Sequence, residues 1–335
     1  MKSKKILVTG VAGYIGSTFT YEALRKGYKV IGLDNFSNSN EKIVTYFLRN
    51  YPQKFKFLEL DLQNQTELNS IIKKHKNIDF VLHFAALKSV PESEEKFDLY
   101  WKNNVEGTKN LLKAMEINKI KNIIFSSSAA IYGEQEIQPI NEEAEPKPIS
   151  NYALTKLQSE TDIEDYALSG IINAISLRYF NPVASHEDYV IYEDYTKSNN
   201  LMSVILQVAK KKIDLLKIYG NDYLTKDGTA ERDFIHINDL IDGHFFALEK
   251  IGTLENYIEI NLGTGKSVSV LEMIKTFKKV NKIDFQVEFS ARRKGDVSIN
   301  YAEVDKAREV LGWQSSHNLE KMCKDAWEAT QNEFK

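Results

Sequence analysis

The sequence predicts an α/β fold: a doubly wound parallel sheet with a smaller mixed α/β lobe in the C-terminal part. Three observations carry this prediction. Strand-like and helix-like stretches alternate through the first half of the 335-residue chain, a glycine-rich turn follows the first strand, and the alternation breaks after Asn181-Pro182. Strands that alternate with helices build a mostly parallel sheet covered on both faces. We therefore expect one domain over 1–182, to which 233–262 returns, and a second lobe over 183–232 and 263–335.

Each element of the first half follows from its hydrophobic period. Short apolar runs such as Ile6-Leu7-Val8 indicate buried strands, and longer stretches with a helical apolar period indicate helices. In such a sheet, right-handed crossovers place ligands at the carboxyl ends of the strands. The expected strands are Lys5–Thr9, Lys29–Leu33, Phe55–Leu60, Phe80–Phe84, Asn122–Ser126 and Ala174–Leu177. The expected helices cover about 14–26, 40–50, 64–76, 96–118 and 152–169.

The second half is less regular. A polar, tyrosine-rich loop at Ser185–Asn200 precedes a helix at about 201–212, and an irregular segment follows at Gly220–Arg232. Another helix is expected at Asn238–Lys250 and a strand at Tyr257–Asn261, before alternating short elements. A smaller lobe threaded in and out of the first domain explains this pattern.

Composition limits the classes of function. Hydrophobic residues make up 42% of the chain and charged residues 27%, which is ordinary for a globular protein with a sizeable core. The net charge of −3, from 44 basic and 47 acidic residues, offers no footprint for nucleic acid or an anionic membrane. The apolar run near the N-terminus is too short for a secretory signal, and no stretch reaches transmembrane length. The expected location is therefore the cytoplasm.

Cysteine and histidine usage argues against disulfides and metals. The single cysteine, Cys323, excludes an intrachain disulfide and fits a reducing compartment. Because it shares a helical period with Met322 and Trp327, we expect it in a core. The six histidines show no metal-ligand spacing, so no metal is expected. The cluster His186-Glu187-Asp188 is interpreted as a solvated loop.

The turn after the first strand predicts a dinucleotide site. Gly10, Gly13 and Gly16 open a helix there, and glycines permit a tight turn and close approach to a pyrophosphate. Asp34 ends the second strand 18 residues after Gly16, near the ~20 expected of a carboxylate that binds ribose. Because an aspartate repels a 2′-phosphate, the expected cofactor is NAD rather than NADP. Asp61, which ends the third strand, either accepts from the adenine or caps the next helix.

A candidate catalytic set lies at the fifth strand and the helix after it. Tyr152 and Lys156 stand four residues apart, so both project from one face of a helix. About two Tyr–Lys pairs with this spacing are expected by chance in a chain of this composition. The position of the pair in the fold must therefore decide whether it is functional. Ser126-Ser127-Ser128 ends the strand, at the edge where this fold places a nicotinamide. A lysine ammonium lowers the pKa of a neighbouring phenol from about 10. Tyr152 is therefore expected to act as a general base beside Ser128.

The fourth strand ends at the same edge, in His83-Phe84-Ala85-Ala86-Leu87-Lys88. Small residues there let a cofactor pass close to the strand end. Lys88 either reaches the nucleotide or the sugar, or it is a solvated loop cation. The convergence of these groups on one edge favours an active site.

With these residues in place, the chain resembles the extended short-chain dehydrogenase/reductase family, and most closely its UDP-glucose 4-epimerase branch. The similarity runs nearly end to end. The glycine and YxxxK motifs are shared by the superfamily, whereas the long block at 218–244 and RYFNPV are more specific to the branch. The segments are GVAGYIGS at 10–17, LDN at 33–35, HFAALKSV at 83–90, NNVEGT at 103–108, SSSAAIYG at 126–133, YALTK at 152–156, RYFNPV at 178–183, NNLM at 199–202, IYGNDYLTKDGTAERDFIHINDLIDGH at 218–244, NLGTG at 261–265 and RRKGD at 292–296.

The resemblance implies a Rossmann-type domain that binds NAD and a lobe that binds a UDP-sugar. It implies that Ser128, Tyr152 and Lys156 are catalytic. The residues implied to line NAD are Gly10, Gly13, Tyr14, Ile15, Gly16, Asp34, Asn35, Asn38, Ser39, Asp61, Leu62, Phe84, Ala85, Ala86, Lys88, Asn104, Ser128, Tyr152, Lys156 and Phe180. Those implied to hold the UDP-sugar are Lys88, Ser128, Tyr152, Asn181, Asn200, Leu201, Lys217, Tyr219, Arg232, Arg293, Asp296 and Asn300.

Two of these assignments have simpler alternatives. Arginines suit a diphosphate because they bind phosphate oxygens in a bidentate fork. From the residues alone, however, Arg232 is also a candidate ion-pair partner of Glu231 or Asp233. Without the resemblance, Arg293 is better interpreted as part of a surface basic run.

The implied reaction is reversible C4 epimerisation of a UDP-hexose. Tyr152 would take the proton of the 4-hydroxyl while NAD⁺ takes hydride from C4; the 4-keto sugar then turns over and hydride returns to its opposite face. Lys156 would bind the nicotinamide ribose and, with the cationic nicotinamide, depress the tyrosine pKa. The cofactor is regenerated in each turnover and can stay bound. Relatives dimerise through the helices at 96–118 and 152–169, so a homodimer is expected.

Two places depart from the family pattern. In the family, a glycine- and proline-rich sequence usually follows RYFNPV, and the loop at 184–194 lacks it. The sequence therefore does not predict the conformation or the contacts of this loop. Asn300 stands where epimerases restricted to glucose and galactose often carry tyrosine. The smaller asparagine leaves room for a 2-acetamido group, unless Tyr301 fills the space.

Rival functions remain. A nucleotide-sugar 4,6-dehydratase needs an extra acid and base, which those relatives supply as Asp-Glu where this chain has Ser128-Ala129. A UDP-glucuronate epimerase or decarboxylase is a weaker rival. A different class is a dinucleotide-binding redox sensor without catalysis, but such proteins tend to lose the tyrosine or the lysine.

Overall fold

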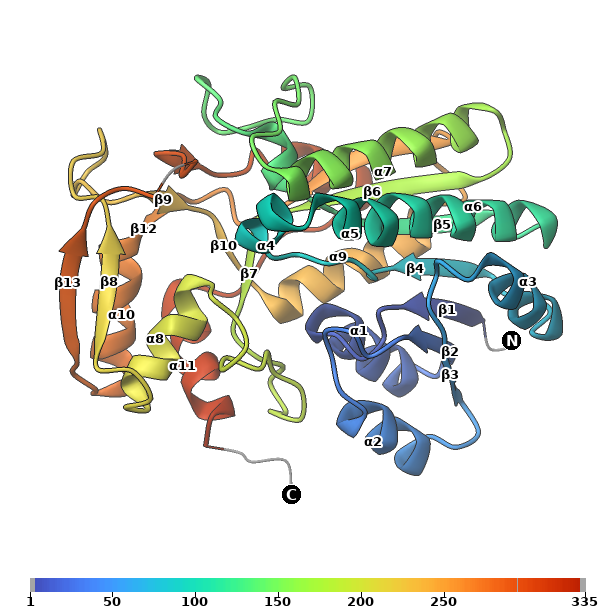
Figure 1. Cartoon of the computed structure of the whole chain (residues 1–335), viewed down its shortest axis with the longest axis horizontal. Coiled ribbons are helices and arrows are strands. Elements are labelled where there is room, and N and C mark those ends of the chain that lie inside the picture. Colours follow the sequence, from blue (N-terminus) through green and yellow to red (C-terminus); the bar gives the residue numbers. More distant parts are fainter. Residues whose placement is uncertain (1–3, 294, 332–335) are drawn as a thin grey trace. The chain divides into compact units, whose positions relative to one another are not determined.

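The structure is a computed structural model that describes residues 4–293 and 295–331, and it divides into two compact units (Figure 1). Each unit contains its own cluster of buried apolar side chains. The first unit comprises Met1–Ile131, Pro146–Arg178 and His244–Ile260, and the second Tyr132–Glu145, Tyr179–Gly243 and Asn261–Lys335.

A seven-stranded sheet forms the centre of the first unit. Its strand order is β11-β6-β5-β4-β1-β2-β3, and the β1–β2, β2–β3, β1–β4 and β4–β5 pairs are parallel. Thr9 pairs with Leu33 and His83, and His83 pairs with Phe125, so these strands end at one edge. The strands are β1 (Lys5–Thr9), β2 (Lys29–Asp34), β3 (Phe55–Glu59), β4 (Phe80–His83), β5 (Asn122–Ser128), β6 (Asn173–Tyr179) and β11 (Tyr257–Leu262).

Helices cover both faces of this sheet, which confirms the predicted doubly wound fold. On one face α3 (Gln65–Lys74), α6 (Gly107–Ile117) and α7 (Asn151–Leu168) share one apolar cluster with the strands. On the other, α1 (Tyr14–Arg25) packs on α9 (Ile237–Lys250) through Phe19 and Phe245, whose ring centroids lie 5.0 Å apart. The remaining helices of this unit are α2 (Lys42–Asn50), α4 (Val90–Glu95) and α5 (Phe97–Tyr100).

The helix expected over 96–118 is not continuous. It consists of α5, a π-helical segment at Trp101–Glu106 and α6. π-Helical turns are frequently found at functional sites. Here the segment carries Asn104, whose exposed fraction is 3%.

The second unit contains small sheets and helices. Strand β7 (Asn181–Val183) pairs in parallel with β10 (Phe234–His236), and β8 (Leu215–Tyr219) pairs in parallel with β13 (Gln286–Ser290). In the third sheet β9 (Glu231–Arg232) lies between β12 (Val268–Ser269) and β14 (Ile299–Asn300). Helices α8 (Leu201–Ala209), α10 (Val270–Asn281) and α11 (Leu319–Ala329) cover the apolar cluster. A short helical turn occupies Ala307–Leu311, and another at Ala129–Tyr132 lies where the chain passes from the first unit to the second.

Two expectations about this unit have different outcomes. Cys323 is fully buried in the apolar cluster, which confirms its predicted core position. Several strands of the unit, such as β9 and β14, were not predicted because two residues are too few to show a period. Of the helices in the described parts of the chain, none has the length and apolar character needed to cross a membrane.

Candidate functional site

The turn after β1 forms a cradle that only glycine permits. Gly10 has φ of +70°, and a Cβ there would lie 2.7 Å from the backbone N of Ala85. A Cβ at Gly16 would lie 2.2 Å from the carbonyl oxygen of Gly10. No side chain caps the start of α1 and its first turn has no acidic residue. Side chains do cap α3, α4, α7, α8, α10 and α11. A bare helix start behind a glycine turn suits a phosphate.

The two acids expected at the nucleotide lie at the ends of neighbouring strands. Asp34 accepts hydrogen bonds from Ala12 N at 2.9 Å and from Ser39 Oγ at 2.8 Å. Asp61 accepts from Asn35 Nδ2 at 3.0 Å and from Gln63 N at 2.8 Å. Asn38 beside them is exposed, and Leu62 is buried. The carboxylates of both acids are therefore fixed by main-chain donors, which suits them to accept from a ribose and an adenine.

Asn104 links the strand-four loop to α7. Its Oδ1 accepts from Leu87 N at 2.8 Å, and its Nδ2 donates to Leu87 O and to Thr155 Oγ1, each at 3.0 Å. Below the loop, His83 is bonded to Thr9 Oγ1 at 2.7 Å and Thr108 Oγ1 at 2.9 Å. The loop thus runs from the buried end of β4 through Phe84, Ala85 and Ala86 to the exposed Lys88. Asn104 fixes the loop's shape, a role that the sequence did not predict.

The three predicted catalytic residues come from β5 and the first two turns of α7. Ser150 caps α7 by accepting from Ala153 N at 3.2 Å, and Tyr152 N donates to Ser93 Oγ at 3.1 Å. Lys156 is 3% exposed, and its Nζ donates to the carbonyl oxygen of Ser126 at 2.6 Å. The same Nζ lies 4.8 Å from the centroid of the Phe125 ring. The lysine thereby ties α7 to the strand end that carries Ser128.

The electrostatics differ from the prediction in one respect. Burial raises the pKa of the Tyr152 phenol, and a hydrogen bond with Ser128 opposes that rise. Burial also lowers the pKa of Lys156 to about 7, so its charge is incomplete near neutral pH. The expectation that the lysine brings the tyrosine pKa down is therefore wrong for the protein's own groups. More positive charge beside the phenol is needed to ionise it.

The second unit carries the residues expected at the UDP-sugar. Arg232 lies on β9 and pairs across the sheet with Asn300 on β14. Its guanidinium donates to Glu231 O at 2.8 Å. Within the described residues it forms no ion pair with Glu231 or Asp233, so that simpler interpretation of Arg232 is not supported. Burial lowers its pKa while the Asp296 carboxylate raises it.

Two consecutive arginines stack on two tyrosines in this unit. Arg292 lies 4.1 Å from the ring centroid of Tyr223, and its Nε donates to Asp222 Oδ1 at 2.8 Å. Arg293 lies 3.9 Å from the ring centroid of Tyr219. The two arginines of the basic run therefore differ. Arg292 is hydrogen-bonded to Asp222, whereas Arg293 is exposed and lies over the face of the Tyr219 ring. Lys294, within the same segment, lies outside the described residues.

The other predicted substrate residues are held by the fold. Asn181 N donates to Asp233 O at 2.9 Å. Asn200 caps α8 through Ser203 N at 2.8 Å, and its Nδ2 donates to Glu193 at 2.6 Å. Leu201 is partly buried and Lys217 is exposed on β8, whereas Phe180, which was predicted to line NAD, is buried. Asn200 is thus fixed by its cap, and its other amide contact is to a protein carboxylate.

The comparisons with known proteins identify the family. A model of the NAD dependent epimerase/dehydratase family matches residues 6–263. Over 324 residues the chain is 42% identical to the UDP-glucose 4-epimerase of Bacillus subtilis (strain 168), which covers 96% of this chain and 95% of that protein. The chain belongs to this NAD-dependent epimerase/dehydratase family. The predicted resemblance and the predicted cofactor, NAD, are confirmed.

Solved structures of family members have the same fold. The UDP-glucose-4-epimerase from Stenotrophomonas maltophila, crystallised with bound NAD and formylated UDP-arabinopyranose, matches with a TM-score of 0.94 and 36% identity over 98% of each chain. The UDP-Glc/GlcNAc 4-epimerase from Campylobacter jejuni matches with a TM-score of 0.86 and 34% identity, covering 98% of this chain and 99% of that one. The glycine cradle, the bare start of α1 and Asp34 in this family member fit NAD.

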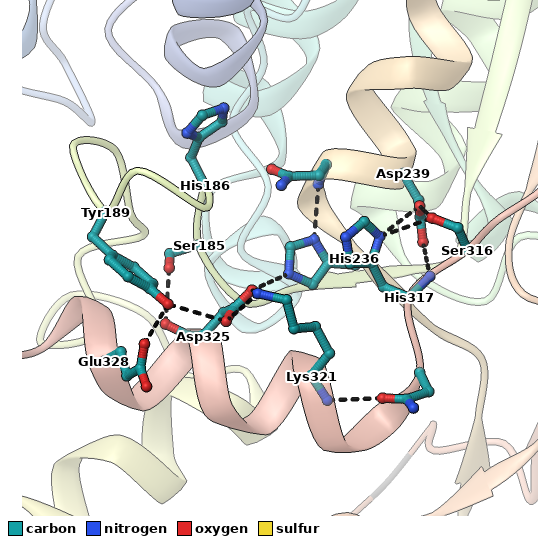
Figure 2. Close-up of polar contacts among 12 residues, drawn as sticks. Ser185, His186, Tyr189, His236, Asp239, Ser316, His317, Lys321, Asp325 and Glu328 are labelled. Carbon is teal, nitrogen blue, oxygen red and sulfur yellow. Dashed lines mark hydrogen bonds and ion pairs between the residues drawn. The ribbon is translucent and has the colours of Figure 1, made fainter.

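A buried polar network fastens the loop after β7 to α11 (Figure 2). Asp325 is fully buried and accepts from His236 Nε2 at 3.1 Å and from Lys321 Nζ at 2.5 Å. Tyr189 OH donates to Asp325 at 3.2 Å and also to Glu328. Ser185 Oγ donates to the backbone carbonyl of Asp325 at 2.8 Å. This loop continues to Asn200, so the network supports a predicted substrate residue.

The network corrects the interpretation of the loop as solvated. His186 is 2% exposed, and its Nδ1 accepts from Asp188 N at 3.1 Å, whereas Glu187 and Asp188 are exposed. The sequence missed the anchor because His236 and Asp325 are 89 residues apart and share no local pattern. Within the described residues, no group of three or more His, Cys, Asp or Glu side chains is arranged to hold a metal ion.

We expect Tyr189→Phe to loosen the loop. The change removes the hydrogen bonds to Asp325 and Glu328, and bonds to charged groups are worth about 1.5–3 kcal/mol. The expected result is a KM for the UDP-sugar that rises several-fold, with kcat nearly unchanged. Steady-state kinetics on the protein with its cofactor measure this. Tyr195→Phe is the matched control, because it removes a phenol oxygen of the same loop that forms no hydrogen bond within the described part of the chain. An unchanged KM in Tyr189→Phe would contradict the assigned role.

Proposed function

We propose that this family member catalyses the reversible C4 epimerisation of a UDP-hexose, UDP-galactose to UDP-glucose, with tightly bound NAD. The observation that carries the proposal is the set of Ser128, Tyr152 and Lys156 at the carboxyl edge of the sheet, in the same unit as the glycine cradle. Relatives about 40% identical over nearly the whole chain are UDP-glucose 4-epimerases. Membership of the family supports a UDP-hexose as the substrate, and the three residues support C4 epimerisation as the reaction.

The protein's own groups supply a proton relay and an electrostatic setting. Tyr152 accepts the proton of the sugar's 4-hydroxyl on its phenolate oxygen and later returns it to the 4-oxygen. Ser128 hydrogen-bonds the phenol and stabilises its ionised form. Lys156 contributes positive charge beside the phenol from a buried position. Bound NAD supplies the acceptor and then the donor of the C4 hydride, and its oxidised ring adds the positive charge that the phenol requires.

The rival functions have less support. β5 ends in Ser128 and is followed by Ala129, so the position at which dehydratases place their acid and base has neither. A UDP-glucuronate-modifying enzyme is not favoured either, because the relatives at about 40% identity are UDP-glucose 4-epimerases. A redox sensor has no need for a tyrosine held by a serine and a buried lysine.

Changing Tyr152 to Phe discriminates enzyme from sensor. The variant lacks the proton acceptor, and removal of a general base typically lowers turnover by about 10²–10⁴-fold. We expect it to retain bound NAD, because the glycine cradle is untouched. Tyr166→Phe, on the same helix, is the control. Full activity of Tyr152→Phe in a coupled assay with UDP-galactose would exclude the proposed mechanism.

The sugar accepted depends on the space beside Asn300. Asn300 is 9% exposed and lies next to Arg232 in the β9–β14 pair. The main chain of Tyr301 is held by Gln138 Oε1, which accepts from Tyr301 N at 3.2 Å, and by Ile140 N, which donates to Tyr301 O at 2.9 Å. In an extended segment neighbouring side chains point to opposite faces. Tyr301 is therefore not expected to fill the space that Asn300 leaves.

We expect turnover of both UDP-galactose and UDP-GalNAc without added NAD. Asn300→Tyr should retain the first activity and lose most of the second, because a larger side chain occupies the room for the 2-acetamido group. Asn300→Ser is the control and should retain both. Separation of the product sugars measures this, and no turnover of UDP-GalNAc by the unchanged protein would exclude the broader specificity.

The symmetric dimer and the cytoplasmic location remain proposals. Apolar side chains are exposed along α4, α5 and α7: Val90 is 42% exposed, Phe97 37%, Leu99 44% and Leu154 39%. Contiguous exposed apolar residues of this kind mark interaction sites, which supports a second copy of the chain as the partner.

We expect a dimer in solution, and we expect the double change Leu99→Glu with Leu154→Glu to shift it to monomer. Burial of two carboxylates against a second copy is unfavourable. Light scattering after size exclusion measures the mass. Leu168→Glu, at the exposed end of α7, is the control. A monomeric mass for the unchanged protein would overturn the proposal.

A further inference from the structure

The helix that carries Tyr152 and Lys156 buries a third ionisable group one turn further along. Glu160 stands four residues after Lys156 in α7, so the two side chains lie on one face. Glu160 is 2% exposed and Arg178, on β6, is 6% exposed. Arg178 Nε donates to Oε1 and Oε2 at 3.2 and 3.3 Å, and an Nη2 hydrogen bond to Oε2 measures 2.9 Å. A buried ion pair of Glu160 and Arg178 thus lies one helical turn from the lysine.

The lysine needs such a neighbour. Its Nζ has the Ser126 carbonyl at 2.6 Å and the Phe125 ring at 4.8 Å, which are a dipole and a ring face rather than a charge. An ammonium buried among uncharged groups loses its proton easily. Burial lowers the pKa of Lys156 to about 7, and the Glu160 carboxylate is the charged group that raises it.

We propose that Glu160 is a positioning residue for the epimerisation: placed by its ion pair with Arg178, it keeps the Lys156 ammonium charged beside Tyr152. It would thereby determine the upper end of the pH range in which the site works. This inference rests on the proposed function, because it assigns a role in that reaction. Neither the sequence motifs nor the family description assigns Glu160 or Arg178 a part in it.

The groups facing this pair come from four elements. On β4, His83 stays neutral, because burial and Lys156 lower its pKa to about 3. On β11, burial and Glu160 raise the pKa of Tyr257, so it too stays neutral, and Glu259 lies near Glu164. On α7, Glu164 interacts with Glu160 and Arg178, and burial raises its pKa. On β6, Arg178 is the cation that balances Glu160.

The sign of the effect follows from the required charges. The reaction requires Tyr152 ionised and Lys156 protonated, so activity falls at alkaline pH as Lys156 loses its proton. Replacing Glu160 with Gln removes a negative charge, so the ammonium loses its proton at lower pH. We expect the alkaline limb of the plot of kcat against pH to shift to lower pH by about one pH unit. A shift of this size is in the range found for a neighbouring opposite charge.

Three further variants separate this role from simple packing. Glu160→Asp keeps the charge and is expected to restore the wild-type limb. Arg178→Gln leaves the carboxylate unbalanced and is expected not to move the limb down. Asp165→Asn removes a carboxylate of the same helix at an exposed position and should leave the profile unchanged. If Glu160→Gln does not fold, because Arg178 is left buried without a charge partner, the double variant Glu160→Gln with Arg178→Met removes the whole pair and should also move the limb down.

A direct titration keeps the test independent of turnover. In the protein with bound NAD and isotope-labelled lysine, the Lys156 Cε resonance is assigned by its loss in Lys156→Arg. The pH midpoint of the titration of this resonance should fall by about one unit in Glu160→Gln and be unchanged in Asp165→Asn. If the unchanged protein has no epimerase activity, the proposed function fails, and this titration still tests the electrostatics. If the protein is active but neither the limb nor the midpoint moves in Glu160→Gln, or if Arg178→Gln moves the limb down equally, the inference is overturned.

Discussion

The bond between the Lys156 ammonium and the Ser126 carbonyl is the contact on which the catalytic half depends. It joins the second turn of α7 to the end of β5, and at 2.6 Å between buried groups it leaves little freedom. Hydrogen bonds with an ionised partner are short and strong. Tyr152, one turn before Lys156, is thereby held near Ser128, which follows Ser126 by two residues and so projects from the same face of the strand. One side chain fixes the relation between the proton acceptor and the group that stabilises it.

Much of this half was predictable because its signals are local. A glycine turn, an acid at a strand end and a tyrosine with a lysine four residues later each report on a few neighbouring residues. Parallel pairing then brings the strand ends to one edge, which is a property of the fold rather than of any side chain. Thr9, His83 and Phe125 lie in register for this reason. The prediction failed for the Tyr152 phenol, because burial raises its pKa and burial cannot be read from spacing.

The second unit was less predictable because long-range polar contacts hold it together. Asp233 is fully buried and accepts from Thr264 N at 2.8 Å, Gly265 N at 2.9 Å and Ala302 N at 3.2 Å. A Cβ at Gly263 would lie 2.5 Å from its carboxylate. The sequence offered Asp233 only as a partner of Arg232. A buried carboxylate satisfied by main-chain donors needs no cation, and Arg232 is then left to interact with another anion. The same logic explains why the anchor of His236 and Asp325 had no local signal.

Burial raises the pKa of Tyr152 and lowers the pKa of Lys156. Together these shifts influence when Tyr152 can accept a proton. Burial keeps the Tyr152 phenol protonated and lowers the pKa of Lys156 to about 7, so near neutral pH the lysine offers the phenol only part of a positive charge. Such a pair does not abstract a proton readily. Positive charge brought close by the oxidised cofactor favours the phenolate, whereas the reduced cofactor does not carry that charge. The phenolate form of Tyr152 is therefore most populated in the redox state in which a proton must leave the sugar.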